Sequence, residues 1–144
     1  MIHAHIDISQ GLDGEPLVLA CFDLGEEQLA ASAHAVAAAT ANYRNAELSV
    51  DDVIELRELT ALGDELGDLS LRPGMRTVVL RPARLTAYRD AVALFIETRD
   101  TAEWVREEDR EPLARVRALL YPLEELCGDA LRAALTGQAA PRLR

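Results

Sequence analysis

The sequence predicts a small, helix-rich domain of the α+β or two-layer α/β class, with a three-stranded sheet and four to five helices packed over one face. Three observations lead to this prediction. Residues 2–9 and 17–24 are β-prone runs joined by a segment rich in glycine, which predicts an N-terminal hairpin. A third β-prone run lies near residues 76–81. The other long segments place apolar residues at helical spacing.

The two strands of the hairpin differ in their patterns. Residues 2–9 alternate, with Ile2, Ala4, Ile6 and Ile8 on one face and His3, His5, Asp7 and Ser9 on the other. This pattern is typical of a half-buried strand near the edge of a sheet. Residues 17–24 are apolar on both faces, which predicts a strand that is central or covered on both sides.

Two helices are expected between the hairpin and the third strand. The first opens at Gly25 with two acidic residues and runs to about Arg44. Its expected inward stripe is Leu29, Ala33, Val36, Thr40 and Tyr43. Ser49 and Asp52 have the spacing of a capping box and start the second helix, which ends near Gly67 or Leu69. The pair Pro73-Gly74 then predicts a type II turn.

The third strand passes at Pro82 into a helix whose inward face is Leu85, Tyr88, Val92, Phe95 and Ile96. After it, Asp100 and Glu103 either cap a short helix that carries Trp104 and Val105 inward, or the preceding helix continues. Pro112 is expected in the first turn of the last helix, which Pro122 should kink or split after Leu120 and Gly137 should end. We therefore expect one domain over residues 1–137 and a flexible tail over 138–144.

The charge of the chain limits its partners. It carries 25 carboxylates against 15 basic residues, all arginine, for a net charge of −10, which argues against nucleic acid as a partner. Five arginines nevertheless gather in one stretch, Arg72, Arg76, Arg81, Arg84 and Arg89, and form either a binding patch or an ordinary solvated surface. The sequence shows no signal peptide and no apolar run long enough for a membrane span, so we expect a cytoplasmic protein.

One short motif has the character of a site. In His3-x-His5-x-Asp7, alternate residues of a strand share a face and converge on one divalent ion if a strand forms. His3 and His5 are therefore the candidate metal ligands, and polar residues on the wet face of an edge strand are the competing interpretation. Cys21 and Cys127 have no metal-binding spacing and are expected as small core residues.

Other chemistry finds little support in the sequence. No phosphate-binding glycine loop is present, and the absence of lysine excludes a Schiff base on this chain. No catalytic residue and no cofactor are predicted, and we lean against an enzyme. The leading hypothesis is a non-enzymatic, cytoplasmic interaction protein, homodimeric or bound to a protein partner, with a regulatory, antitoxin-like or immunity-like role. The alternative is a small metal-dependent enzyme or metal sensor that uses the His3-x-His5 strand.

Overall fold

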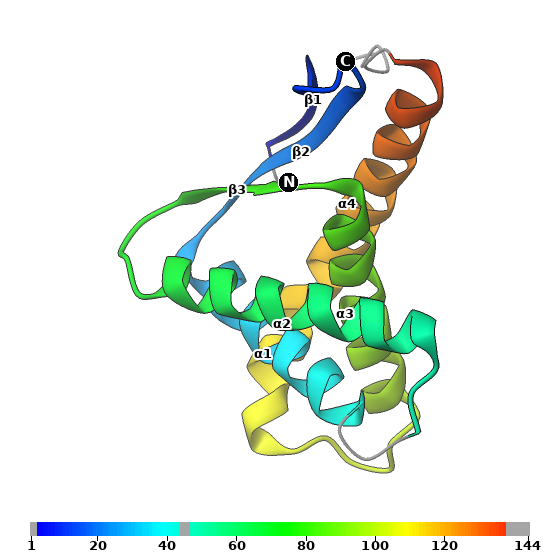
Figure 1. Cartoon of the computed structure of the whole chain (residues 1–144). Helices are drawn as coiled ribbons and strands as arrows, with labels where there is room; N and C mark the ends of the chain where they lie inside the picture. The colour runs from blue at the N-terminus through cyan, green and yellow to red at the C-terminus, as the bar shows by residue number, and fades with distance from the viewer. Residues whose placement is uncertain (1–2, 44–46, 138–144) are drawn as a thin grey trace.

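A computed structural model describes residues 3–43 and 47–137. The described chain is an α+β fold with a small sheet at one end and helices that extend away from it (Figure 1). Its elements in order are β1 (Ala4–Gln10), β2 (Pro16–Leu24), α1 (Glu26–Tyr43), α2 (Val50–Ser70), β3 (Arg76–Leu80), α3 (Pro82–Asp100) and α4 (Glu107–Thr136). The predicted three strands are confirmed, and the described helices number four.

The sheet is antiparallel throughout, with the strand order β1-β2-β3. β1 and β2 form the expected hairpin, which leaves β1 at an edge and β2 in the centre. One face of the sheet is apolar and joins the core through Val18, Ala20, Phe22, Leu24, Val78 and Leu80, with Ala4, Ile6 and Ile8 packed beside them. α4 contacts β1 and β2, and α3 contacts β2, so these helices cover this face.

Several local predictions are confirmed by the cap geometry. Ser49 accepts a hydrogen bond from the Asp52 backbone, and the Asp52 carboxylate accepts one from the Ser49 backbone, which is the predicted capping box. Gly74 has a φ of +90°, the left-handed conformation that the prediction required at this glycine. Gly137 ends α4 with a φ of +68°.

The expected inward stripe of the first helix is partly wrong. Leu29 and Val36 are buried, but Ala33, Thr40 and Tyr43 are only half-buried. The other buried residues of α1 are Ala31, Ser32, Ala35 and Ala39. The buried face is wider than one stripe because α1 packs against α2, α3 and α4 together.

The last helix differs most from its prediction. α4 begins at Glu107, before Pro112, and continues through both prolines without interruption to Thr136. Pro122 therefore does not split it. No helix covers residues 101–106, and Trp104 is 71% exposed rather than turned inward.

Three predictions fall on residues outside the described ranges: the first strand's start at Ile2, the first helix's end at Arg44, and the tail over 138–144. Within the described ranges, none of the helices combines the length and the apolar character that a bilayer crossing needs.

Candidate metal centre on the open sheet face

The face of the sheet away from the core carries the polar side chains of the hairpin. We call it the open face, and its residues are His3, His5, Asp7, Ser9, Leu17, Leu19, Cys21, Asp23, Thr77 and Val79. Of the two alternatives for the second strand, the central position is the one found, and the helices that touch the sheet pack on the core face. Side chains of neighbouring strands meet on this face: the Thr77 hydroxyl of β3 donates to Asp23 Oδ1 of β2 at 2.6 Å.

Three potential metal ligands meet on this face. His5, Asp7 and Cys21 each offer a ligand atom, and these atoms all lie within 4.8 Å of one another. His5 Nε2 lies 3.4 Å from Asp7 Oδ1, and the Cys21 thiol donates to Asp7 Oδ2 at 3.5 Å. Tetrahedral zinc with ordinary bond lengths separates neighbouring ligand atoms by about 3.3 to 3.8 Å. The two contacts to Asp7 have this spacing, one to each of its carboxylate oxygens, and the three ligand atoms together lie within 4.8 Å.

The register of the hairpin produces this grouping. A five-residue loop, from Gly11 to Glu15, connects the paired residues Gln10 and Pro16. Counting back from that pair sets His5 directly opposite Cys21. Residues opposite each other in an antiparallel pair have Cβ atoms about 5 Å apart, closer than residues two apart along one strand. The register therefore adds Cys21 of the second strand to His5 and Asp7, which share one face of the first strand.

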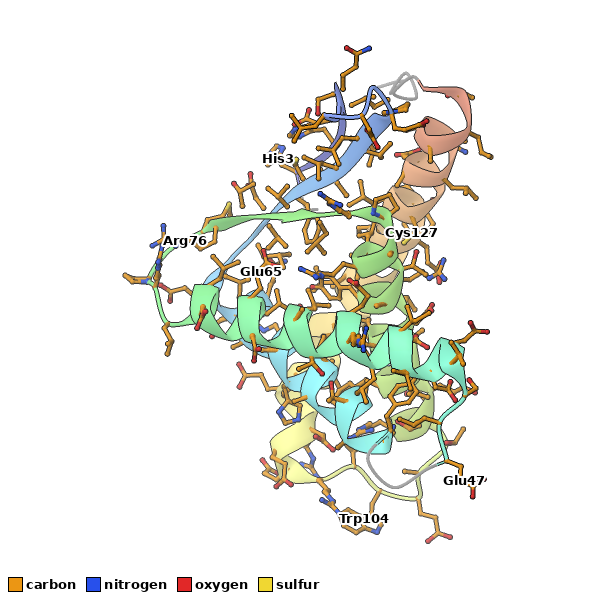
Figure 2. The ribbon with its side chains drawn as sticks, viewed as in Figure 1. His3, Glu47, Glu65, Arg76, Trp104 and Cys127 are labelled. Carbon is orange, nitrogen blue, oxygen red and sulfur yellow. The ribbon has the colours of Figure 1, made fainter. Side chains whose placement is uncertain are left out.

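Of the two predicted metal ligands, the structure groups His5 with other ligands but not His3. His5 belongs to the cluster, together with Asp7 of the same motif. His3 lies on the open face beyond it, where its backbone carbonyl accepts a hydrogen bond from Asp23, and its side chain is not among the grouped ligand atoms. Figure 2 shows His3 beside the hairpin, at the sheet end of the molecule.

Cys21 is the residue of the cluster that sequence reasoning missed as a ligand. It was expected in the core, yet it points to the open face and is only 6% exposed because its neighbours on the sheet surround it. Burial, with the nearby Asp7 carboxylate, raises the pKa of the Cys21 thiol. A divalent ion supplies the opposite influence, since coordination stabilises the thiolate. The signal that finds Cys21 from sequence is the loop length, which fixes the register.

Cys127 is separated from this cluster by the sheet. It lies on α4, packs against the core and is half-buried, and its thiol donates weakly to the Leu85 carbonyl at 3.8 Å. Both cysteines are free thiols.

The arginine stretch does not act as one basic patch. Arg84 contacts Glu58 at 2.9 Å and Glu65 at 3.9 Å, and Arg89 contacts Asp90 at 2.8 Å. Arg76 donates to the Pro73 carbonyl at 3.0 Å. Carboxylates neutralise two of the five arginines, which leaves Arg72 and Arg81 on exposed surface.

A second polar cluster lies at the opposite end of the helices. His34 Nε2 is 2.7 Å from Asp109 Oδ1, and Arg99 Nε donates to Asp109 Oδ2 at 3.3 Å. Asp109 is 6% exposed and lies in the first turn of α4. The hydrogen bond from His34, supported by Arg99, lowers the pKa of Asp109. This cluster links α1, α3 and α4, and we interpret it as a structural contact between these helices.

An acidic groove of about 300 Å³ lies between α1, α2 and α3. Its apolar lining consists of Ala39, Leu59, Ala91, Ala93 and Leu94, and its polar lining consists of Tyr43, Glu55, Asp90 and Glu97. The Tyr43 hydroxyl donates to Glu55 at 2.7 Å, and burial together with Glu55 raises the pKa of Tyr43 to about 12.

Comparison with known proteins adds no assignment: no protein-family model, no curated protein and no solved structure matches this chain.

Proposed function

We propose that the protein binds one divalent transition-metal ion, zinc in the first place, through His5, Asp7 and Cys21 on the open face. The observation that carries this proposal is the grouping of three different ligand types, from two paired strands, within 4.8 Å. Imidazole, carboxylate and thiolate are the ligands that zinc takes in proteins. A thiolate in the set also disfavours the hard ions magnesium and calcium.

The exposure of the site suits an exchangeable ion better than one locked into the fold. The side chains of His5 and Asp7 are 61% and 60% exposed, so an ion has direct access from solvent. Three protein ligands leave a fourth tetrahedral position open to water or to another molecule. The protein would then act as a metal sensor, as a metal carrier, or through a bound metal that itself binds a small ligand.

Zinc titration of protein prepared without a histidine tag tests the site. We expect one ion per chain, and replacement of a ligand, His5→Ala or Cys21→Ser, should weaken binding by about 100-fold or more, since even outer-shell substitutions cost about 10- to 100-fold. His3→Ala and Cys127→Ser are the matched controls, each removing a potential ligand outside the cluster. Unchanged affinity in Cys21→Ser, or equal losses in the controls, contradicts the proposal.

A second candidate function, interaction with a basic protein partner, is favoured by the acidic groove. The chain's net charge of −10 steers basic partners toward it, and a lining of apolar and carboxylate side chains matches an arginine side chain, which has an apolar stem and a charged end. An antitoxin-like or immunity-like role is one form of this proposal.

Binding of an oligoarginine peptide tests the groove. The triple variant Glu55→Gln, Asp90→Asn, Glu97→Gln should weaken binding by about tenfold. The control variant Glu107→Gln, Glu108→Gln, Glu111→Gln removes the same charge from α4 and should weaken it much less. Equal losses in the two variants show that only net charge attracts the peptide and contradict a groove site.

A further inference from the structure

A cavity of about 540 Å³ adjoins the proposed metal site. It lies between the sheet, α2 and the start of α3, and its lining comprises Leu19, Glu58, Glu65, Val79, Leu80, Arg81, Ala83 and Arg84. Figure 2 shows Glu65 in the space between α2 and β3. Two of the lining residues, Leu19 and Val79, belong to the open face.

The strand register fixes how close this cavity is to the cluster. Leu19 pairs with Asp7, and Val79 pairs with Cys21. Each apolar lining residue on the open face is therefore the cross-strand neighbour of a proposed metal ligand, and Cβ atoms of such neighbours lie about 5 Å apart. The two apolar lining residues and the proposed metal ligands therefore lie side by side on one face of the sheet.

Arg81 supplies a positive charge at the same place. It follows β3 by one residue, continues the open-face row of Thr77 and Val79, and lines the cavity. Within residues 3–43 and 47–137, no hydrogen bond or ion pair of its side chain is found, whereas Arg84 is held by Glu58 and Glu65. Arg81 is thus the cation in this cavity that an anionic ligand can engage without displacing a carboxylate.

We propose that the site binds a small organic monocarboxylate with an apolar body, an inference that rests on the proposed metal site. The carboxylate occupies the fourth coordination position of the metal and pairs with Arg81, and the apolar body lies on Leu19 and Val79 and enters the cavity. With Arg81 paired to the first carboxylate, Glu58 and Glu65 outnumber Arg84 in charge, so a second carboxylate on the ligand meets repulsion in the cavity.

Cobalt as the bound metal gives a readout that needs no enzymatic activity. The full chain is loaded with Co²⁺, whose visible absorption reports its coordination, and hexanoate, acetate, adipate and inorganic phosphate are added separately. Hexanoate should change the cobalt spectrum in a saturable way, about tenfold more tightly than acetate because its longer chain is buried. Adipate, with its second charge, should bind more weakly than hexanoate.

Two variants locate the effect. Arg81→Ala should weaken hexanoate binding by about fivefold and leave cobalt affinity unchanged. Arg72→Ala, which removes an arginine outside the cavity lining, should change neither. An unchanged hexanoate affinity in Arg81→Ala overturns the assigned role of Arg81 and with it the proposed pose.

The outcomes separate the two proposals. If cobalt does not bind to the cluster, the metal site fails and this inference falls with it. If cobalt binds but hexanoate leaves its spectrum unchanged, the metal site stands and the carboxylate site is overturned. Phosphate or acetate binding as tightly as hexanoate overturns the assigned ligand class.

Discussion

At the scale of single residues, the interior contains a polar pair that must be satisfied within the protein. Ser32 of α1 and Tyr88 of α3 are both 0% exposed, and their hydroxyl oxygens lie 2.5 Å apart. Burial raises the pKa of Tyr88, so the phenol stays protonated and either hydroxyl can act as the donor.

This pair should behave non-additively on mutation. Tyr88→Phe leaves the Ser32 hydroxyl buried without its partner and should lower the free energy of unfolding by about 1 to 3 kcal/mol. Adding Ser32→Ala removes the unsatisfied group and should recover most of that loss. Denaturant unfolding of the two single variants and the double variant measures the coupling; strictly additive losses contradict this account.

Asp109 makes the stability of the fold depend on pH in the acidic range. Because its folded-state pKa is lowered by His34 and Arg99, its contribution to stability is present above the carboxyl group's unfolded pKa of about 3.9 and is lost as the pH falls through the lower folded value. At neutral pH, Asp109→Asn should cost about 1 to 3 kcal/mol.

Unfolding measured between about pH 2 and pH 7 checks the sign of this effect. The stability difference between the wild type and Asp109→Asn should shrink as the pH falls below about 4. Glu107→Gln, on the same helical turn but exposed, is the control and should show a small and nearly constant difference. A difference that grows in acid contradicts the role assigned to Asp109.

At the scale of elements, α4 shows how tertiary packing overrides a local helix breaker. Pro122 cannot donate to the carbonyl four residues earlier, yet the helix continues through it. Its buried face, from Leu113 to Ala133, packs against α1, α3 and both strands of the hairpin. These contacts hold the helix together despite the missing hydrogen bond.

Replacing this proline should therefore stabilise the protein. Pro122→Ala restores a backbone donor and removes the steric conflict of the ring, for a gain of about 1 to 3 kcal/mol in the free energy of unfolding. Thermal and denaturant unfolding measure the gain. A loss of stability shows instead that the proline ring makes a packing contact worth more than the hydrogen bond.

The same elements show what the sequence could and could not predict. The strands, the capping box at Ser49 and the strand-to-helix step at Pro82 depend on neighbouring residues, so local rules identified them. The path of α4 and the burial of Asp109 depend on contacts with elements distant in sequence. Local pattern alone could not reveal them, nor the width of the buried face of α1.

The candidate site shows the same division. The alternation of residues 2–9 predicts the polar face of the first strand, and with it the shared face of His5 and Asp7. Cys21 was assigned to the core because an apolar run on both faces resembles a covered strand. The strand register places Cys21 on the same face as Asp7, and the helices cover the opposite face, so Cys21 faces Asp7 rather than the core.

At the scale of the whole molecule, the sheet ends at β1 and β3, which pair on one side only within the described chain. Unpaired sheet edges favour association between chains, and twofold dimers are the commonest oligomers. We therefore predict a homodimer. Sedimentation equilibrium of the full chain should give twice the chain mass of 15.8 kDa. A single-chain mass at every concentration tested contradicts it.

The central claim, that the open face binds a metal through His5, Asp7 and Cys21, is tested most directly by anomalous diffraction at the zinc edge from crystals grown with zinc. The account predicts one peak per chain, about 2.0 to 2.3 Å from a His5 nitrogen, an Asp7 oxygen and the Cys21 sulfur. A peak coordinated elsewhere, at His3 or at His34 and Asp109, or no peak at all, would contradict it.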